Sequence, residues 1–282
     1  MTEFLDIDGG RIAYDVTGAG PLVVLAHGMG DNRNAYRFLV PVLAEAGYRV
    51  AATDLRGHGE SSTGWSSYTR TDTAGDLLAL VRHLAGDLNS PAVIVGHSFA
   101  GGSATIAAAQ APELVSAVVE IDPFTRVPKI SYGAFLTNSG YRRGGLRLMA
   151  TALTGSVGAW TSYLNVAFPG RKPADYAQAI AALQANLREP GRMKAAQQMG
   201  KSRPSDAEAR LGGIRCPALV IMGSLDSDWA DPKAEGDAIV AAMPAGLGRA
   251  VMIDGAGHYP HTQFPDQVAA AVLPFLKEHA SA

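Results

Sequence analysis

The stretch Gly-His-Ser-Phe-Ala at residues 96–100 decides how the rest of the chain is interpreted. It follows an apolar run at 92–95 and opens a run of small residues at 101–109. This order is typical of a strand, a sharp turn and a helix, and a serine at such a turn exposes its hydroxyl beside the helix N-terminus. The pattern is G-x-S-x-G with Ala100 in place of the last glycine, and the small flanking residues let strand and helix pass close together. A serine that only caps a helix after a buried strand would give the same pattern.

Four further motifs end or follow an apolar run, as the serine motif does. They are His27-Gly28, Asp-Leu-Arg-Gly-His-Gly-Glu-Ser at 54–61, Gly-Ser-Leu-Asp at 223–226 and Gly-Ala-Gly-His at 255–258. In their order along the chain, these motifs resemble the landmarks of the α/β-hydrolase superfamily, and the resemblance covers nearly the whole sequence. It implies the α/β-hydrolase fold, with a mostly parallel central sheet and helices on both faces, and serine hydrolase chemistry.

The composition suits one large α/β domain, or a core with a modest insertion, because 47% of the 282 residues are hydrophobic. The net charge is −2, and no basic stripe or nucleic-acid-binding motif is present, so we expect no nucleic-acid partner. No apolar run approaches the roughly 20 residues of a membrane span, and no secretory signal is visible. The lone Cys216 is expected to pack rather than react. We therefore expect a soluble, cytoplasmic protein with a small-molecule substrate and no membrane partner, and the oligomeric state stays open.

Short apolar runs alternate with helical stretches after residue 21, which predicts strands buried on both faces of a parallel sheet. A hairpin over residues 4–16 is expected before them. Helices are expected at 34–46, 71–85, 98–109, 232–243 and 265–279. Every motif above follows a predicted strand, and in such sheets the working groups lie at the carboxyl ends of the strands. The motifs should therefore converge on one edge of the sheet.

The alternation of strand and helix stops in the middle of the chain. Residues 123–213 contain helical stretches at 176–188 and 191–200 but no clear buried strand, and a structureless loop of that length would be improbable. Following the resemblance, we expect residues 1–122 and 214–282 to form the core and residues 123–213 to form a helical cap or lid inserted in it.

Aromatic residues of this cap are candidates for lining an acyl pocket. The four that we single out are Phe124, Phe135, Trp160 and Tyr163. Packing within the cap would explain an aromatic residue equally well. If none of the four selects the substrate, the core loops around Met29, Trp65 and Phe99 are the remaining candidates.

Ser98 needs a base within hydrogen-bond reach to act as a nucleophile, and the base needs an acid that holds its tautomer. His258 is the best candidate for the base, because it follows the last predicted core strand on a loop and matches the family's catalytic histidine. For the acid, Asp226 occupies the family's G-x-x-D position, with Asp228 in reserve and Asp122 third. Aspartates in such loops are more often turn formers or helix caps. The order serine, aspartate, histidine is the one that this fold uses.

The tetrahedral intermediate of acyl transfer needs hydrogen-bond donors aimed at its oxygen. The backbone N–H of Phe99, directly after the serine, is one candidate, and the resemblance implies the N–H of Met29 as the second. The turn formed by His27 and Gly28 lies beside Met29 in sequence. We expect these two residues, with Trp65, to border the substrate.

No metal-ligand pattern or cofactor motif is persuasive. His258 and His261 are three residues apart but lie in a proline-containing loop, and no helix carries H-E-x-x-H. No G-x-G-x-x-G opens a helix after the first core strand, so no dinucleotide is expected. We therefore expect neither a metal nor a cofactor.

Together these residues predict a serine hydrolase that cleaves small to medium carboxylic esters through an acyl-enzyme. A lactonase, a C–C bond hydrolase or a cofactor-free perhydrolase of the haloperoxidase-like kind would use the same residues. A ligand-binding receptor that kept the pocket and lost turnover is an alternative of a different class. The branches with an aspartate nucleophile, dehalogenases and epoxide hydrolases, are disfavoured because position 98 is serine.

Overall fold

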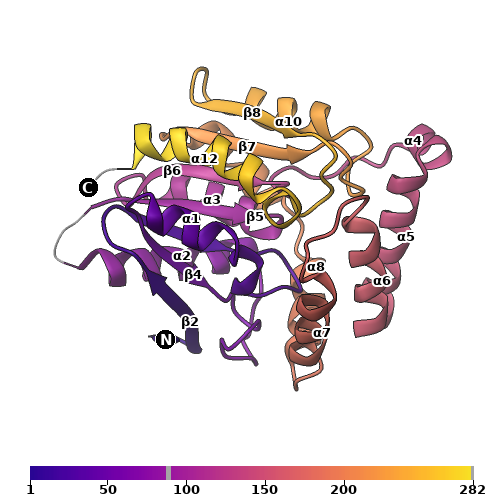
Figure 1. The fold of residues 1–282 in the computed structure, drawn as a ribbon, viewed down its shortest axis with the longest axis horizontal. Helices are drawn as coiled ribbons and strands as arrows, with labels where there is room; N and C mark the ends of the chain where they lie inside the picture. The colour runs from indigo at the N-terminus through magenta and orange to yellow at the C-terminus, as the bar shows by residue number, and fades with distance from the viewer. Residues whose placement is uncertain (87–89, 281–282) are drawn as a thin grey trace.

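An eight-stranded sheet lies at the centre of the structure, a computed structural model that describes residues 1–86 and 90–280 (Figure 1). The strands lie in the order β1-β2-β4-β3-β5-β6-β7-β8. β1 pairs antiparallel with β2, and β2 pairs antiparallel with β4, whereas all other neighbours are parallel. The strands are β1 (Glu3–Ile7), β2 (Gly10–Thr17), β3 (Leu22–Ala26), β4 (Arg49–Thr53), β5 (Ala92–His97), β6 (Val115–Ile121), β7 (Ala218–Gly223) and β8 (Gly248–Ile253). The mostly parallel sheet predicted from the sequence is confirmed.

Helices cover both faces of this sheet, because successive residues of the central strands point to opposite faces and both faces are apolar. On one face lie α2 (Arg70–Ala85), α3 (Phe99–Gln110) and α10 (Pro232–Ala241). On the other face lie α1 (Leu39–Glu45) and α12 (Pro265–His279). The two faces bury two separate apolar clusters, each built from alternate residues of β3 and β5. The α/β-hydrolase architecture expected from the motifs is thereby confirmed.

The helix expected at 34–46 is broken in two. A 3-10 turn, η1 (Arg33–Tyr36), comes first and is capped by the side chain of Asn32. Helix α1 begins only at Leu39. Pro41 explains the break, because a proline lacks the backbone N–H and is tolerated only in the first turn of a helix.

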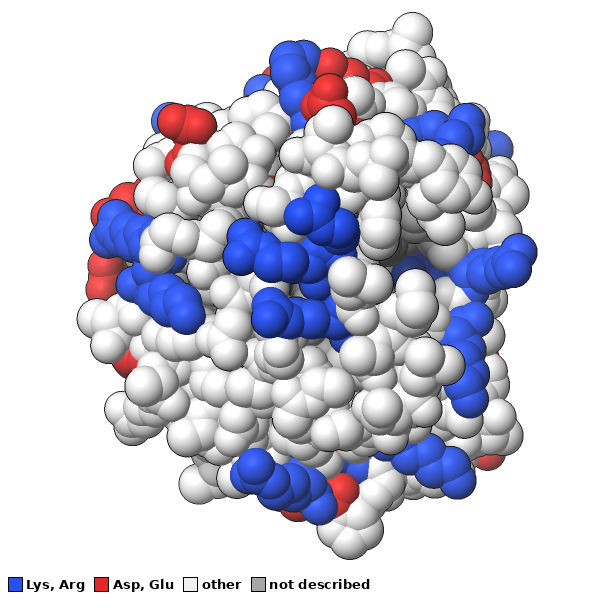
Figure 2. Space-filling view, turned by 90° about the vertical axis from the view of Figure 1, so that its right-hand side faces the viewer, with Lys and Arg blue, Asp and Glu red and all other residues white. Residues whose placement is uncertain are grey.

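Between β6 and β7 the described chain forms helices and their connections, without a strand. They are α4 (Tyr132–Thr137), α5 (Ser139–Thr154), α6 (Val157–Ala167), α7 (Tyr176–Leu187), α8 (Arg192–Lys201), α9 (Ser205–Glu208) and η3 (Leu211–Gly213). Helices α4 to α8 gather at one end of the sheet (Figure 1), where α6, α7 and α8 share an apolar cluster of their own. Lys and Arg side chains predominate over the middle of this side of the molecule (Figure 2). Throughout residues 1–86 and 90–280, no helix has the length and apolar character needed to cross a membrane.

Glu120 is a fully buried acid within the sheet, on β6. The hydroxyl of Thr105 donates to one of its carboxylate oxygens, and the hydroxyl of Thr125 donates to the other at 2.9 Å. Burial outweighs these hydrogen bonds and raises the pKa of Glu120 from 4.5 to about 7. The folded state therefore holds this proton more tightly than the unfolded chain does. The resulting contribution of Glu120 to the free energy of unfolding is fully present below pH 4.5 and is lost as the pH rises through about 7.

The variant Glu120→Gln should therefore gain stability over the wild type as the pH rises. Glutamine keeps the shape and can still hydrogen-bond both threonine hydroxyls, but it carries no charge to bury. Thermal unfolding followed by circular dichroism at pH 5 and pH 8 should show a larger rise in melting temperature at pH 8. Glu113→Gln, at an exposed position, is the control and should show no such dependence. An equal effect of Glu120→Gln at both pH values would contradict a raised pKa.

Candidate active site

Ser98 sits in a strained turn between β5 and α3. Its backbone has φ 52° and ψ −114°, a conformation that residues other than glycine rarely adopt. The turn is held because the Ser98 N–H donates to the carbonyl oxygen of Ile121 on β6 at 2.8 Å. A Cβ on Gly96 would lie 2.3 Å from the carbonyl oxygen of Ala100. Only small residues fit where strand and helix cross, which is the physical reason for the sequence pattern.

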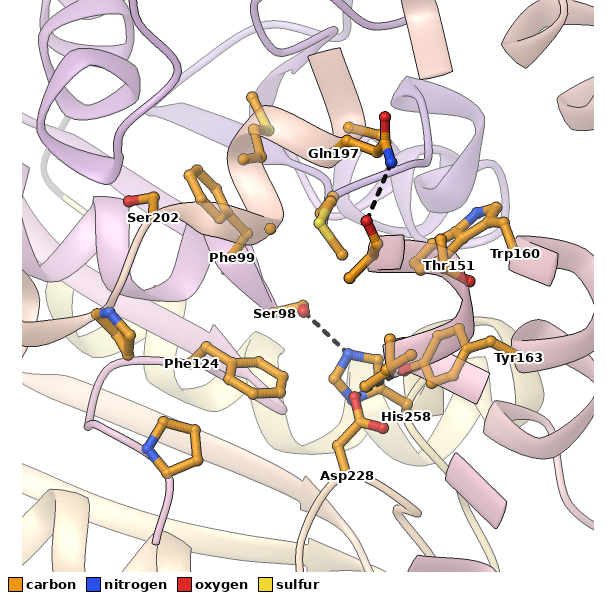
Figure 3. Close-up of a pocket in the computed structure, with 18 of the residues that line it drawn as sticks. Ser98, Phe99, Phe124, Thr151, Trp160, Tyr163, Gln197, Ser202, Asp228 and His258 are labelled. Atoms are coloured by element: carbon orange, nitrogen blue, oxygen red, sulfur yellow. Dashed lines mark hydrogen bonds and ion pairs between the residues drawn. The ribbon is translucent and has the colours of Figure 1, made fainter. Parts of the chain in front are cut away.

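His258 reaches Ser98 from the loop after β8. Its Nε2 lies 2.9 Å from Ser98 Oγ. The loop is anchored from two directions: the His258 N–H donates to the carbonyl oxygen of Ala167 in α6 at 3.0 Å, and the Gly257 N–H donates to Gln263 Oε1 at 2.8 Å. The structure thus brings together the two residues that the sequence put forward as nucleophile and base (Figure 3).

Two aspartates approach the other side of the imidazole, from the loop after β7. Asp226 Oδ2 lies 2.8 Å from His258 Nδ1, and Asp226 Oδ1 accepts the backbone N–H of Asp228 at 2.9 Å. Asp228 Oδ2 is farther from the same nitrogen, at 3.6 Å, and accepts the hydroxyl of Tyr163 at 2.7 Å. The hydrogen bond to the imidazole is therefore made by Asp226, and Asp228 stands beside it.

Asp122, the third candidate, lies behind Asp226 at the end of β6. It is fully buried with φ 40°, and its Oδ1 accepts the N–H of Gly223 at 2.8 Å. Burial and the charge of Asp226 raise the pKa of Asp122 well above its ordinary value. Among the described residues, Asp122, Asp226 and His258 have potential metal-binding atoms within 4.8 Å of one another. The hydrogen bond between Asp226 and His258 already uses two of these atoms.

The charges around His258 favour its protonated form. Burial alone lowers the pKa of His258, but the carboxylates of Asp226 and Asp228 outweigh burial and raise that pKa above 6.5. Burial raises the pKa of Asp228 itself to about 6. Near neutral pH the imidazole therefore faces negative charge on one side and a serine hydroxyl on the other. Such an arrangement can take a proton from the hydroxyl and stabilise the imidazolium that forms.

Two backbone N–H groups next to Ser98 are free to bind a ligand oxygen. Within the described chain, neither the N–H of Met29 nor that of Phe99 donates a hydrogen bond to another protein group. The loop carrying Met29 lies against the serine, since a Cβ on Gly28 would be 2.9 Å from Ser98 Cβ. Phe99 is the first residue of α3, where the backbone N–H groups have no partner within the helix.

A cavity of about 390 Å³ lies above Ser98 and His258, between the strand ends and the helices α5, α6 and α8 (Figure 3). Three of the four aromatic candidates line it: Phe124, Trp160 and Tyr163. Met29 and Phe99 line it as well. Sequence reasoning missed the residues that α5 and α8 contribute, among them Thr151, Met193, Gln197 and Met199. On α8 the signal was present, because Met193, Ala196 and Met199 share one apolar face of the helix.

Four residues expected to border the substrate do not line this cavity. Trp65 packs beneath the β1–β2 hairpin, where its indole N–H donates to the Ser62 carbonyl and the Arg56 guanidinium stacks on its ring. Phe135 lies on the short helix α4, away from the strand ends (Figure 1). His27 is fully buried and accepts the N–H of Leu55 through Nε2 at 3.0 Å, which holds the turn. Gly28 packs against the Ser98 side chain and offers no side chain of its own.

Arg70, on the first turn of α2, is a further cavity residue that sequence reasoning missed. It is almost completely buried, and it forms no ion pair with a carboxylate in the described chain. The spacing of apolar residues along α2 was the signal, since Arg70 falls in line with Ala74, Leu77 and Val81.

Comparison with known proteins places the chain among enzymes of one fold. The model of the alpha/beta hydrolase family matches residues 23–271. The 2-(acetamidomethylene)succinate hydrolase of Mesorhizobium japonicum is 28% identical over 280 residues, which cover 96% of this chain and 94% of that enzyme. An epoxide hydrolase of Caballeronia sordidicola is 38% identical over 126 residues, which cover 40% of this chain and 37% of that enzyme.

The fold comparison agrees with the sequence comparison. The structure of an esterase from Exiguobacterium antarcticum matches with a TM-score of 0.80 over 98% of this chain and 100% of that chain, at 20% identity. The family model spans most of the sequence, and the strands and motifs that it covers are those that build the site described above. The chain belongs to the alpha/beta hydrolase family, and it is a hydrolase.

Proposed function

We propose that this hydrolase cleaves small to medium carboxylic esters through an acyl-enzyme, with Ser98 as nucleophile, His258 as general base and Asp226 as the acid that orients it. One observation carries the proposal: the continuous hydrogen-bonded path from Ser98 Oγ to His258 Nε2 at 2.9 Å, and from His258 Nδ1 to Asp226 Oδ2 at 2.8 Å. In the neutral imidazole, with Nδ1 donating to Asp226, Nε2 carries no proton and faces the hydroxyl.

The steps follow from these positions. His258 Nε2 takes the hydroxyl proton while Ser98 Oγ attacks the acyl carbon, and the same histidine then gives the proton to the departing alcohol. The oxyanion of each tetrahedral intermediate is bound by the free N–H groups of Met29 and Phe99. A water molecule, activated by His258, attacks the acyl-enzyme and releases the acid. Because the donors belong to the backbone, the side chains of residues 29 and 99 are free to shape the cavity.

Residues 123–213 act in this proposal as a cap that completes the pocket. Their helices provide Trp160 and Tyr163 to the cavity wall, and the Trp160 indole N–H donates to the Gly30 carbonyl at 2.9 Å. The cap is thus joined to the loop that carries Met29. A cavity of about 390 Å³ with a mainly apolar wall suits an acyl group of small to medium size.

A second candidate reaction on the same residues is hydrolysis of an acylamino bond. It is favoured by the relative that aligns over 96% of the chain, whose name specifies an acetamido-substituted succinate. The two candidates are distinguished by assaying purified protein with aryl esters of increasing acyl length beside an N-acetyl enamide, a lactone and a diketone. Turnover of the esters alone would support ester hydrolysis, whereas turnover of another compound alone would overturn it.

Replacing Ser98 with alanine should abolish covalent labelling by a fluorophosphonate probe and lower ester turnover by about 10⁴-fold or more, because the members of such a triad act as a unit. Ser202→Ala, which removes a hydroxyl from the same cavity, is the matched control and should keep its labelling. Mass spectrometry of the labelled peptide identifies the site. Labelling that persists in Ser98→Ala would show that another residue is the nucleophile.

Asp226→Asn and Asp122→Asn should differ sharply in turnover. An amide at 226 cannot hold the imidazole tautomer or stabilise the imidazolium, so kcat should fall by about 10⁴-fold. The hydrogen bond to His258 is made by Asp226, and Asp122 accepts the Gly223 N–H instead, so an amide at 122 should leave kcat within about tenfold of the wild type. Circular dichroism confirms that both variants fold. If Asp122→Asn proved as damaging as Asp226→Asn, Asp122 would be the acid.

The pH profile should report the charge of Asp228. Only neutral His258 can accept the serine proton, so kcat/KM falls as the pH drops through the raised pKa of His258. Asp228→Asn removes one of the carboxylates that raise this pKa, and the acidic limb should move to lower pH by about 1 unit. Asp231→Asn, whose side chain caps α10, is the control. An unshifted limb in Asp228→Asn would mean that its charge does not act on His258.

A further inference from the structure

Arg70 is a buried cation on a helix face that otherwise carries apolar side chains. It is 4% exposed, and on α2 it is aligned with Ala74, Leu77 and Val81 of the core face. A buried charge is costly unless a partner of opposite charge compensates it. Such a position for an arginine therefore calls for a partner.

The protein gives the Arg70 guanidinium one hydrogen-bond acceptor but no carboxylate in contact with it. Arg70 Nη1 donates to the Ser202 carbonyl oxygen at 2.9 Å, and Arg70 Nε has no hydrogen-bond partner. The acid whose charge acts on it, Asp206, forms no ion pair with it and accepts the Thr71 hydroxyl at 2.8 Å. Burial lowers the pKa of Arg70 to about 10, so the side chain remains a cation at neutral pH.

The other well-buried arginines of the described chain show the usual arrangement. Arg56 makes a two-pronged bond with Asp76 at 2.7 Å, Arg33 binds Asp54, and Arg126 binds Glu235 at 2.9 Å. Arg70 differs from these arginines because it has no carboxylate partner in the described chain, and its side chain lines the cavity. The missing negative charge would therefore have to come from a ligand.

The position of Arg70 relates it directly to Ser98. Its guanidinium carbon lies 4.3 Å above the ring centre of Phe99, the residue that follows the serine. Its stem crosses α3 at Gly102, where a Cβ would lie 2.9 Å from Arg70 Cδ. Ser98, Phe99 and Arg70 line the same cavity. A group bound by Arg70 would thus sit at the far end of a ligand whose reacting carbon lies at Ser98.

The charge of the surrounding segment favours the same kind of ligand. Residues 123–213 contain 13 Lys and Arg against four Asp and Glu, a net charge of +9, whereas the rest of the chain has a net charge of −11. Figure 2 shows this side of the molecule, with Lys and Arg over the middle of the face. Arg203, which is exposed, also lines the cavity. A positive face around a low-dielectric cavity attracts anions and raises their rate of association.

We propose that Arg70 binds a carboxylate carried by the acyl part of the substrate, so that the enzyme prefers the half-esters of small dicarboxylic acids over neutral esters. The inference rests on the proposed function, because it assigns the acyl group of that reaction. A single carboxylate fits the site, since Arg70 is the one buried Lys or Arg of the cavity in the described chain. Nη1 donates to Ser202 and Nε is buried against α3 at Gly102, which leaves Nη2 to donate to a carboxylate oxygen of the ligand.

The test compares two substrates that differ only at the acyl terminus. The 4-nitrophenyl half-ester of glutaric acid ends in a carboxylate, and 4-nitrophenyl pentanoate ends in a methyl group. The ratio of their kcat/KM values should fall by about 10- to 100-fold in Arg70→Met, mainly through the KM of the half-ester. Arg70→Lys should retain part of the preference, and Arg143→Met, an exposed α5 variant outside the cavity, should leave the ratio unchanged.

A binding measurement separates this inference from the proposed function. Butyrate, a simple monocarboxylate, should raise the melting temperature of the wild type and of Arg143→Met but not of Arg70→Met. If the wild type hydrolyses neither ester while butyrate still stabilises it through Arg70, the anion site stands and ester hydrolysis fails. If both esters are hydrolysed with the same ratio in wild type and Arg70→Met, ester hydrolysis stands and the anion site fails. Equal stabilisation of wild type and Arg70→Met by butyrate would also overturn the anion site.

Discussion

The close crossing of β5 and α3 is the constraint on which the rest of the site depends. Because a Cβ on Gly96 would collide with the Ala100 carbonyl, the strand and the helix can come this close only with glycine at position 96. The serine takes up the strain in its own backbone, at φ 52°, and the hydrogen bond from its N–H to Ile121 ties the turn to the centre of the sheet. The hydroxyl is thereby held in the cavity wall in a fixed position before any ligand binds.

The groups that face Ser98 come from separate strand ends and are positioned by one another. The loop after β8 is held to α6 through the His258 N–H. The loop after β7 is organised by Asp226, which accepts hydrogen bonds from His258 Nδ1–H and from the Asp228 N–H. A parallel sheet makes this convergence possible, since the carboxyl ends of its strands lie at a single edge. The helices between β6 and β7 then close the cavity over that edge.

Charge is distributed unevenly around the cavity. Three acids, Asp122, Asp226 and Asp228, lie on the His258 side, where burial raises the pKa of Asp122 and the charges of Asp226 and Asp228 raise the pKa of the imidazole. Arg70 lies on the α2–α3 side and forms no ion pair with a carboxylate among the residues that the structure describes. An ester placed between the two sides would have its acyl carbon near the imidazole and its acyl terminus near a cation. The polarity of the cavity thus suggests an orientation for the substrate.

The sequence by itself determined the fold and the identity of the residues that meet at Ser98, because both depend on local patterns: apolar runs of strand length, and short motifs directly after them. It could not tell which side chains of separate elements share a cavity. Trp65 looked available but stacks under the hairpin, and Phe135 lies on α4 away from the strand ends, whereas Arg70 enters the cavity beside Phe99. Only the tertiary structure decides such cases, since burial and charge pairing are set by contacts between residues far apart in the chain, such as Arg70 and Ser202.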